Sequence, residues 1–152
     1  MVRHPMWLSA CEVLNTLAGG WRFDRLIDNG ASMSGVAAFI KRDGACLDYH
    51  EQGRLRLAGG QILGAERRYI FRDEDNGFSA LFAENPPRLF HRIVLRLADT
   101  SLTGTGRHFC GDDRYETRYE FRADGSFGVR HAVFGPRKRY AIMTDYVRAN
   151  LS

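Results

Sequence analysis

The feature that most constrains this chain is a period-two alternation of apolar and polar residues, which begins after Gly20 and continues along the rest of the sequence. Such alternation is typical of β-strands that bury one face. It is interrupted by turn signals at Asp28-Asn29-Gly30, Asp43-Gly44, Gly59-Gly60, Asp75-Asn76-Gly77, Pro86-Pro87, Asp124-Gly125 and Gly135-Pro136. The pattern predicts a meander of about nine antiparallel strands, because no helical segments are present to make parallel crossovers.

A long meander must hide its two open edges, which favours closure into a barrel. We therefore expect an all-β fold, a single antiparallel up-and-down β-barrel over residues 20–150. With 152 residues the chain has the size of one domain, so we predict a single domain over 1–152. Residues 5–18 fit a short amphipathic N-terminal helix, because Pro5 suits its first turn and Gly19-Gly20 suits its end.

Charge and cysteine content narrow the partners and the cellular compartment that we expect for the protein. The net charge is +4, but the basic residues are dispersed, so we expect a solvated basic surface and no nucleic-acid partner. Cys11, Cys46 and Cys110 cannot all pair with each other, and we interpret them as reduced thiols of a cytoplasmic protein. No apolar run approaches the length of a membrane span, so no membrane partner is expected. A homodimer through a barrel edge or wall is compatible with the sequence.

Alternation also assigns side chains to the two faces of each predicted strand. In 47–57, Leu47, Tyr49, Leu55 and Leu57 share the predicted core face with Glu51. The same interpretation of the other strands gives an inward charged or titratable set of Arg25, Glu51, Arg67, His91, Asp113, Lys138 and Arg148. Buried charges are costly unless they are paired. A set spread over nearly every strand therefore favours a polar cavity over a packed apolar core.

Two interpretations of this inward set stay open. Glu51 with Arg67, and Asp113 with another base, can form internal ion pairs that only satisfy each other. Inward bases outnumber inward acids, however, and the excess positive charge favours an anionic group, such as a carboxylate or phosphate, in the cavity.

Gly19-Gly20-Trp21 resembles the Gly-x-Trp signature of lipocalins and other calycin barrels. In that family an arginine of the last strand packs over the tryptophan, so the resemblance implies a structural barrel closure by Trp21 and Arg148. The whole chain also resembles an uncharacterised family of small bacterial and fungal lipocalin-like proteins. The residues that carry this resemblance are Tyr49-x-Glu51-x-Gly53, Arg67-x-Tyr69, Phe90-His91, His108-x-Cys110-x-x-Asp113-x-Tyr115, Gly135-Pro136-Arg137-Lys138 and Tyr146-x-Arg148. The resemblance implies the fold and the inward residues, and it implies no activity.

Metal, haem and nucleophilic chemistry have weaker support in the sequence. His108-x-Cys110-x-x-Asp113 contains metal-ligand residue types, but the spacing fixes no complete ligand set. A haem ligand at His91 or His108 would rest on nothing more than a histidine on an apolar face. Cys110 beside His108 lacks a third partner for nucleophilic catalysis. We therefore predict no metal and no cofactor.

The function that these patterns favour is the binding of a small anionic organic ligand in a polar barrel cavity. The predicted ligand-binding residues are Tyr49, Glu51, Arg67, Tyr69, His91, His108, Cys110, Asp113, Tyr115, Lys138 and Tyr146. One alternative is a small barrel enzyme doing acid–base chemistry of the isomerase or cyclase type, with His108, Asp113 and Tyr115 as candidates for proton transfer. A second alternative is a protein-interaction module whose polar core is purely structural.

Overall fold

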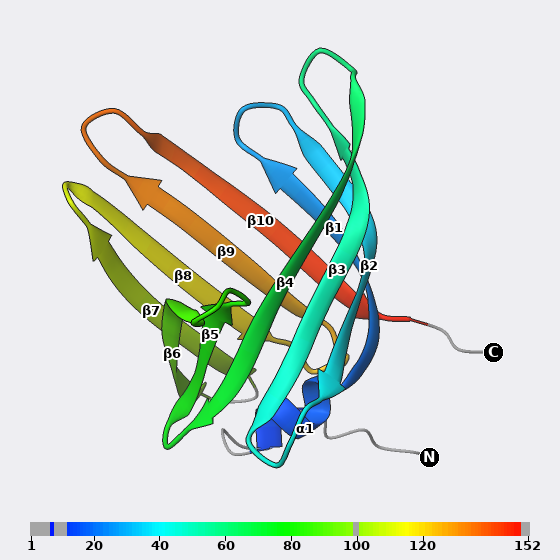
Figure 1. The fold of residues 1–152 in the computed structure, drawn as a ribbon, viewed down its shortest axis with the longest axis vertical. Helices are drawn as coiled ribbons and strands as arrows, with labels where there is room; N and C mark the ends of the chain where they lie inside the picture. The colour runs from blue at the N-terminus through cyan, green and yellow to red at the C-terminus, as the bar shows by residue number, and fades with distance from the viewer. Residues whose placement is uncertain (1–6, 8–11, 99–100, 150–152) are drawn as a thin grey trace.

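The computed structural model describes residues 7, 12–98 and 101–149, and in these residues ten antiparallel strands form a closed barrel (Figure 1). Its elements are α1 (Val13–Leu17), β1 (Gly19–Ile27), β2 (Ser32–Lys41), β3 (Cys46–Arg56), β4 (Ile62–Glu74), β5 (Gly77–Phe82), β6 (Arg88–Ala98), β7 (Ser101–Cys110), β8 (Asp113–Phe121), β9 (Phe127–Phe134) and β10 (Arg139–Arg148). Each strand pairs with its neighbours in sequence, and β1 pairs with β10 to close the barrel. The predicted all-β up-and-down barrel with a short N-terminal helix is confirmed.

The described part of the chain has ten strands, against the predicted count of about nine. A turn at Gly111-Asp112, which is missing from the turn signals listed above, separates β7 from β8. Gly111 adopts a φ of +62°, a left-handed conformation that favours glycine. One glycine followed by one aspartate is therefore enough to reverse the chain between these strands.

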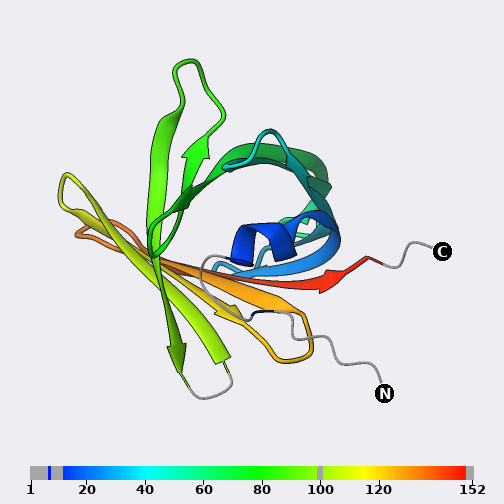
Figure 2. The same cartoon turned by 90° about the horizontal axis from the view of Figure 1, so that it is seen from below.

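The N-terminal helix covers one end of the barrel, as the view from below shows (Figure 2). Of the predicted helix over 5–18, the structure describes α1, the flanking Glu12 and Ala18, and Trp7; the other predicted residues lie outside the described part. Leu14 and Leu17 face the core, and Gly19, with a φ of +124°, redirects the chain from the helix into β1. The apolar side chains of the helix thus close this end of the barrel, which we call its base.

The base is sealed by aromatic rings and by one arginine. Trp21 is fully buried, its ring centroid lies 4.8 Å from that of Phe127, and its Nε1 donates to the Leu17 carbonyl oxygen at 2.9 Å. The Arg148 guanidinium lies 4.0 Å from the centroid of the Trp21 ring and donates to the carbonyl oxygens of Thr16 and Ala18. The cation–π contact joins the last strand to the first one, and the hydrogen bonds join the last strand to the end of α1.

No helix in the described residues is long and apolar enough to cross a membrane.

Candidate functional site

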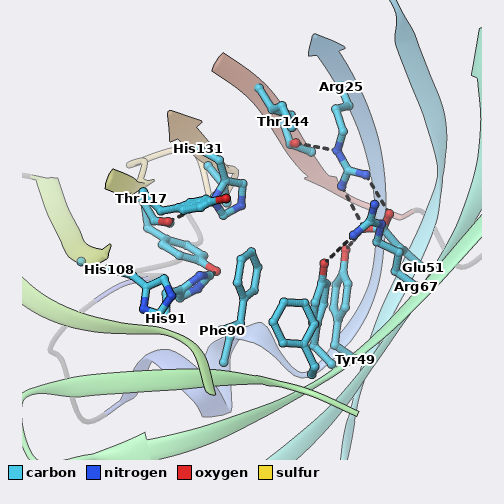
Figure 3. Close-up of a pocket in the computed structure, with 18 of the residues that line it drawn as sticks. Arg25, Tyr49, Glu51, Arg67, Phe90, His91, His108, Thr117, His131 and Thr144 are labelled. Atoms are coloured by element: carbon cyan, nitrogen blue, oxygen red, sulfur yellow. Dashed lines mark hydrogen bonds and ion pairs between the residues drawn. The ribbon is translucent and has the colours of Figure 1, made fainter. Parts of the chain in front are cut away.

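A cavity of about 490 Å³ lies inside the barrel, and every one of the ten strands contributes to its lining (Figure 3). This volume is within the range of roughly 300–1,000 Å³ that is usual for small-molecule sites. Nine of the predicted ligand-binding residues line it, namely Tyr49, Glu51, Arg67, Tyr69, His91, His108, Cys110, Tyr115 and Tyr146. The other two, Asp113 and Lys138, are not part of the lining.

A buried ion pair between β1 and β3 forms one side of the cavity (Figure 3). Arg25 donates from Nη1 to Oε2 of Glu51 at 2.7 Å and from Nη2 to Oε1 at 2.8 Å, while its Nε donates to Oγ1 of Thr144 at 2.8 Å. The Glu51 side chain is 1% exposed and that of Arg25 is 14% exposed. Burial alone would raise the pKa of Glu51, but the hydrogen bonds and charge of Arg25 outweigh it and lower this pKa. The carboxylate is therefore ionised and neutralised by Arg25.

Glu51 does form an internal ion pair, one of the two interpretations left open by the sequence, but its partner is Arg25 and not Arg67. The two residues lie directly opposite each other on β3 and β4, but the carboxylate turns toward the Arg25 guanidinium, which binds both of its oxygens. Bidentate geometry of this kind is the stronger arrangement. Arg67 lines the cavity without taking part in this ion pair.

Arg67 is the cation of this cluster that lacks a paired acid. Its Nη1 donates to the hydroxyl oxygen of Tyr69 at 3.3 Å, and no carboxylate in the described part of the chain forms an ion pair with it. Its charge adds to the lowering of the Glu51 pKa. Glu51 is ion-paired with Arg25, so Arg67 leaves the cluster with an excess positive charge that faces the cavity.

Aromatic rings form the wall beside this cluster. The Phe90 ring stacks on Tyr69, with centroids 5.4 Å apart and 16° between the planes, and Tyr69 stacks on Tyr49 at 5.8 Å. Tyr49 also shares a 2.8 Å hydrogen bond with the hydroxyl of Tyr146, whose pKa burial raises to about 12. Flat, apolar faces next to a cation suit a planar organic anion.

A β-bulge explains why Phe90 lies in the wall. The β5–β6 register pairs Ala80 with His91 and then Leu81 with Leu89, so Phe90 is the extra residue on β6. As a result Phe90 and His91, which are consecutive in sequence, both line the cavity. Simple alternation assigns them to opposite faces.

The opposite side of the cavity carries two neutral histidines from β6 and β9 (Figure 3). His91 Nε2 and the Tyr119 hydroxyl share a 3.0 Å hydrogen bond, and His131 Nδ1 and the Thr117 hydroxyl share another at 3.0 Å. Burial, followed by the charges of His131 and His108, lowers the pKa of His91 well below 6.5. Burial, followed by the Arg25 and Arg67 charges, lowers the pKa of His131 to about 4. Both imidazoles are therefore uncharged at neutral pH.

The three candidates for proton transfer, all within the described residues, are neighbours, but no direct hydrogen bond joins any two of them. His108 and Tyr115 line the rim of the cavity, with ring centroids 5.9 Å apart. Asp113 lies 3.5 Å from Nζ of Lys138, which also donates to the Tyr115 hydroxyl at 3.3 Å. Asp113 and Lys138 thus form the second ion pair that the sequence left open, outside the cavity lining.

The lining also includes residues that were not predicted to bind the ligand, among them Arg25, Phe90, Thr117 and His131. His131 was visible in principle, because it alternates with Phe127, Val129 and Val133 along β9. Arg25 appears in the inward set, but its place beside Glu51 depends on the pairing of β1 with β2 and of β2 with β3. The inward position of Phe90 could not be predicted from alternation, because the bulge shifts the alternation at this residue.

Comparisons with known proteins identify a family. A family model described as "Family of unknown function (DUF6314)" matches residues 17–148. No curated protein matches the chain. Among solved structures, EF1p2_mFAP2b bound to DFHBI is similar at 12% identity and a TM-score of 0.48, covering 93% of this chain and 100% of that one.

Two further solved barrels are similar at the same level. The redesigned β-barrel mFAP1 bound to DFHBI has 14% identity and a TM-score of 0.44, covering 92% of this chain and 100% of that chain. A mutant of the fluorescent protein UnaG has 15% identity and a TM-score of 0.38, covering 91% of this chain and 100% of that chain. Likenesses this distant say nothing about a ligand.

Proposed function

This chain belongs to DUF6314, a family of unknown function, and we propose that it is a lipocalin-like protein that binds a small, flat organic anion inside its barrel. The proposal rests on one observation above the others. Arg67 faces a cavity of about 490 Å³ while the nearby acid, Glu51, is held by Arg25. Arg67 is exposed at the open side of the cavity, and an anionic group of a ligand would supply its missing partner.

The rest of the cavity supports the same class of ligand. Tyr69 and Phe90 offer stacked rings on which an aromatic body can lie. On the far side His131 is neutral, and its Nδ1 is engaged by Thr117, so Nε2 remains for a polar group of the ligand. The ligand then places its anion at Arg67 and an uncharged polar group near His131, with its flat body between them.

Loss of the Arg67 charge is expected to weaken the binding of an aromatic sulfonate. We predict that Arg67→Gln raises the Kd for 8-anilinonaphthalene-1-sulfonate about tenfold, since a charge-assisted hydrogen bond contributes roughly 1.5–3 kcal/mol before solvent screening. Fluorescence titration at low ionic strength measures the change. Arg68→Gln is the matched control, because it removes the same charge from the adjacent, outward position of β4; its Kd is expected to stay within about twofold of wild type.

An uncharged probe separates charge from shape. N-phenyl-1-naphthylamine has a similar flat body without the sulfonate, and its Kd is expected to be the same for wild type and Arg67→Gln. Equal losses for both probes, or equal effects of Arg67→Gln and Arg68→Gln on the sulfonate, would contradict an anion site at Arg67. Failure of the wild-type protein to bind the sulfonate would contradict it as well.

A further inference from the structure

The barrel wall is incomplete between β6 and β7. Residues 94–98 of β6 pair with residues 101–105 of β7, and the register ends at Val94 and Thr105. Beyond this point β6 stays paired with β5, and β7 stays paired with β8 up to Cys110. Figures 1 and 2 both show the β5–β6 hairpin diverging from the β7–β8 hairpin. Gly106 still packs closely against the backbone carbonyl of Arg92. Beyond that contact, the backbone edges of 88–91 and 107–110 face each other across a gap.

Burial patterns show that this gap reaches the cavity. In the paired half of β7, residues 101–104 alternate between partly and fully buried, whereas residues 107–110 are all exposed. Residues 62–68 of β4, which extend past the short strand β5, are exposed or half-buried on both faces. His108 and Cys110 on β7 and Phe90 on β6 line both the gap and the cavity. Side chains on the inner face here meet solvent instead of an opposite wall.

Two unpaired strand edges can in general bind an added peptide strand. Features of both edges disfavour such strand addition here. The bulge at Phe90 breaks the regular spacing of hydrogen-bonding groups on the β6 edge. Arg88 and Arg92 on β6 and Arg107 on β7 place exposed charges along the two edges. Bulges and edge charges are the devices by which proteins block strand addition. They leave the gap free for a small molecule.

We infer that the gap between 88–91 of β6 and 107–110 of β7 is the entrance through which the ligand reaches the cavity. This inference rests on the proposed function. An anion that enters here passes the aromatic wall at Phe90 and meets Arg67 on β4. Opening requires only that the β5–β6 hairpin move relative to β7, because backbone hydrogen bonds do not join the two edges beyond Val94 and Thr105.

Bridging the gap is expected to slow ligand exchange in both directions. Leu89 and Cys110 lie equally far beyond the last pair, Val94 and Thr105. The test uses the full chain with Cys11→Ser, Cys46→Ser and Leu89→Cys, cross-linked to native Cys110 by bismaleimidoethane. Stopped-flow fluorescence with 8-anilinonaphthalene-1-sulfonate measures both rates. We expect association and dissociation each to fall about tenfold or more relative to the same protein capped with N-ethylmaleimide, as lid opening sets such rates.

A second bridge controls for general stiffening of the barrel. Val94→Cys with Thr105→Cys, in a background that also carries Cys110→Ser, links the same strands where they are already paired. Its rates are expected to match those of its capped form. Rates that are insensitive to the Leu89–Cys110 bridge, or equally slowed by both bridges, would overturn the entrance. Equilibrium titration judges the proposed function separately, because a closed entrance changes rates while a lost anion site changes Kd.

Hydrogen exchange tests the gap without any ligand. Along a strand, successive amides point alternately to the two neighbouring strands. We therefore expect every second amide in 107–110 to exchange fast, while those that face β8 and those in 102–105 are protected. Uniform protection through 107–110 would show that β6 and β7 are joined along their whole length, and it would overturn the entrance whether or not the sulfonate binds.

Discussion

Replacing Glu51 with leucine is expected to lower the free energy of unfolding by about 3–5 kcal/mol, because Arg25 then keeps a buried charge without its partner. The carboxylate accepts two hydrogen bonds from Arg25 and a third from Tyr49 at 2.6 Å, so one substitution removes three bonds. In a chain of this length the thermal midpoint should fall by roughly 10–15 °C. Urea denaturation and a thermal melt at pH 7 measure both quantities.

A double variant distinguishes the charge from the packing. Arg25→Met with Glu51→Leu removes both charges and fills the same space with apolar side chains, and it is expected to recover most of the stability that Glu51→Leu loses. Glu66→Gln is the control on the neighbouring strand, where the carboxylate is exposed beside His50; its midpoint should stay close to that of wild type. A double variant as unstable as Glu51→Leu would mean that the loss comes from shape and not from an unpaired Arg25.

How far the sequence predicts this network shows what alternation can and cannot determine. The alternation in 47–57 predicts Glu51 on the inner face, and the side chain is almost completely buried. Alternation assigns a face, but it does not say how strands align across the barrel. Arg25 meets Glu51 only because β1, β2 and β3 are in one particular register. The burial of Glu51 was therefore predicted correctly, whereas the open alternative of a pair with Arg67 named the wrong partner.

Strand ends and bulges mark the other limits of sequence interpretation. Asp113 lies on the first position of β8, where the wall of the barrel ends, so an inward direction there does not lead into the cavity. Phe90 enters the cavity because one extra residue on β6 shifts the alternation. The period-two pattern reports neither the height of a residue along the barrel nor the presence of a bulge. Both depend on how neighbouring strands pair with each other.

The two neutral histidines of the cavity predict a free energy of unfolding that depends on pH. The native protein keeps His131 neutral down to about pH 4, whereas an imidazole in the unfolded chain has a pKa of about 6.5. Between these values the unfolded chain binds more protons, so the free energy of unfolding falls as the pH drops and this contribution levels off below about pH 4. His91, whose pKa is also lowered, acts in the same direction. Glu51, whose pKa is lowered from 4.5, loses its contribution only at more acidic pH.

His131→Gln is expected to remove about 2 kcal/mol of the stability difference between pH 7 and pH 5, measured by urea denaturation at both values. The cause is local, because burial and the guanidinium charges of Arg25 and Arg67 oppose protonation of this ring. Thr117→Val provides the matched control, since it removes the hydrogen bond to Nδ1 but leaves the titrating group in place. Thr117→Val should therefore lower stability at both pH values while keeping the difference between them. An unchanged difference in His131→Gln would mean that the native cavity accommodates the protonated imidazole, and the far side of the site would then be able to carry positive charge itself.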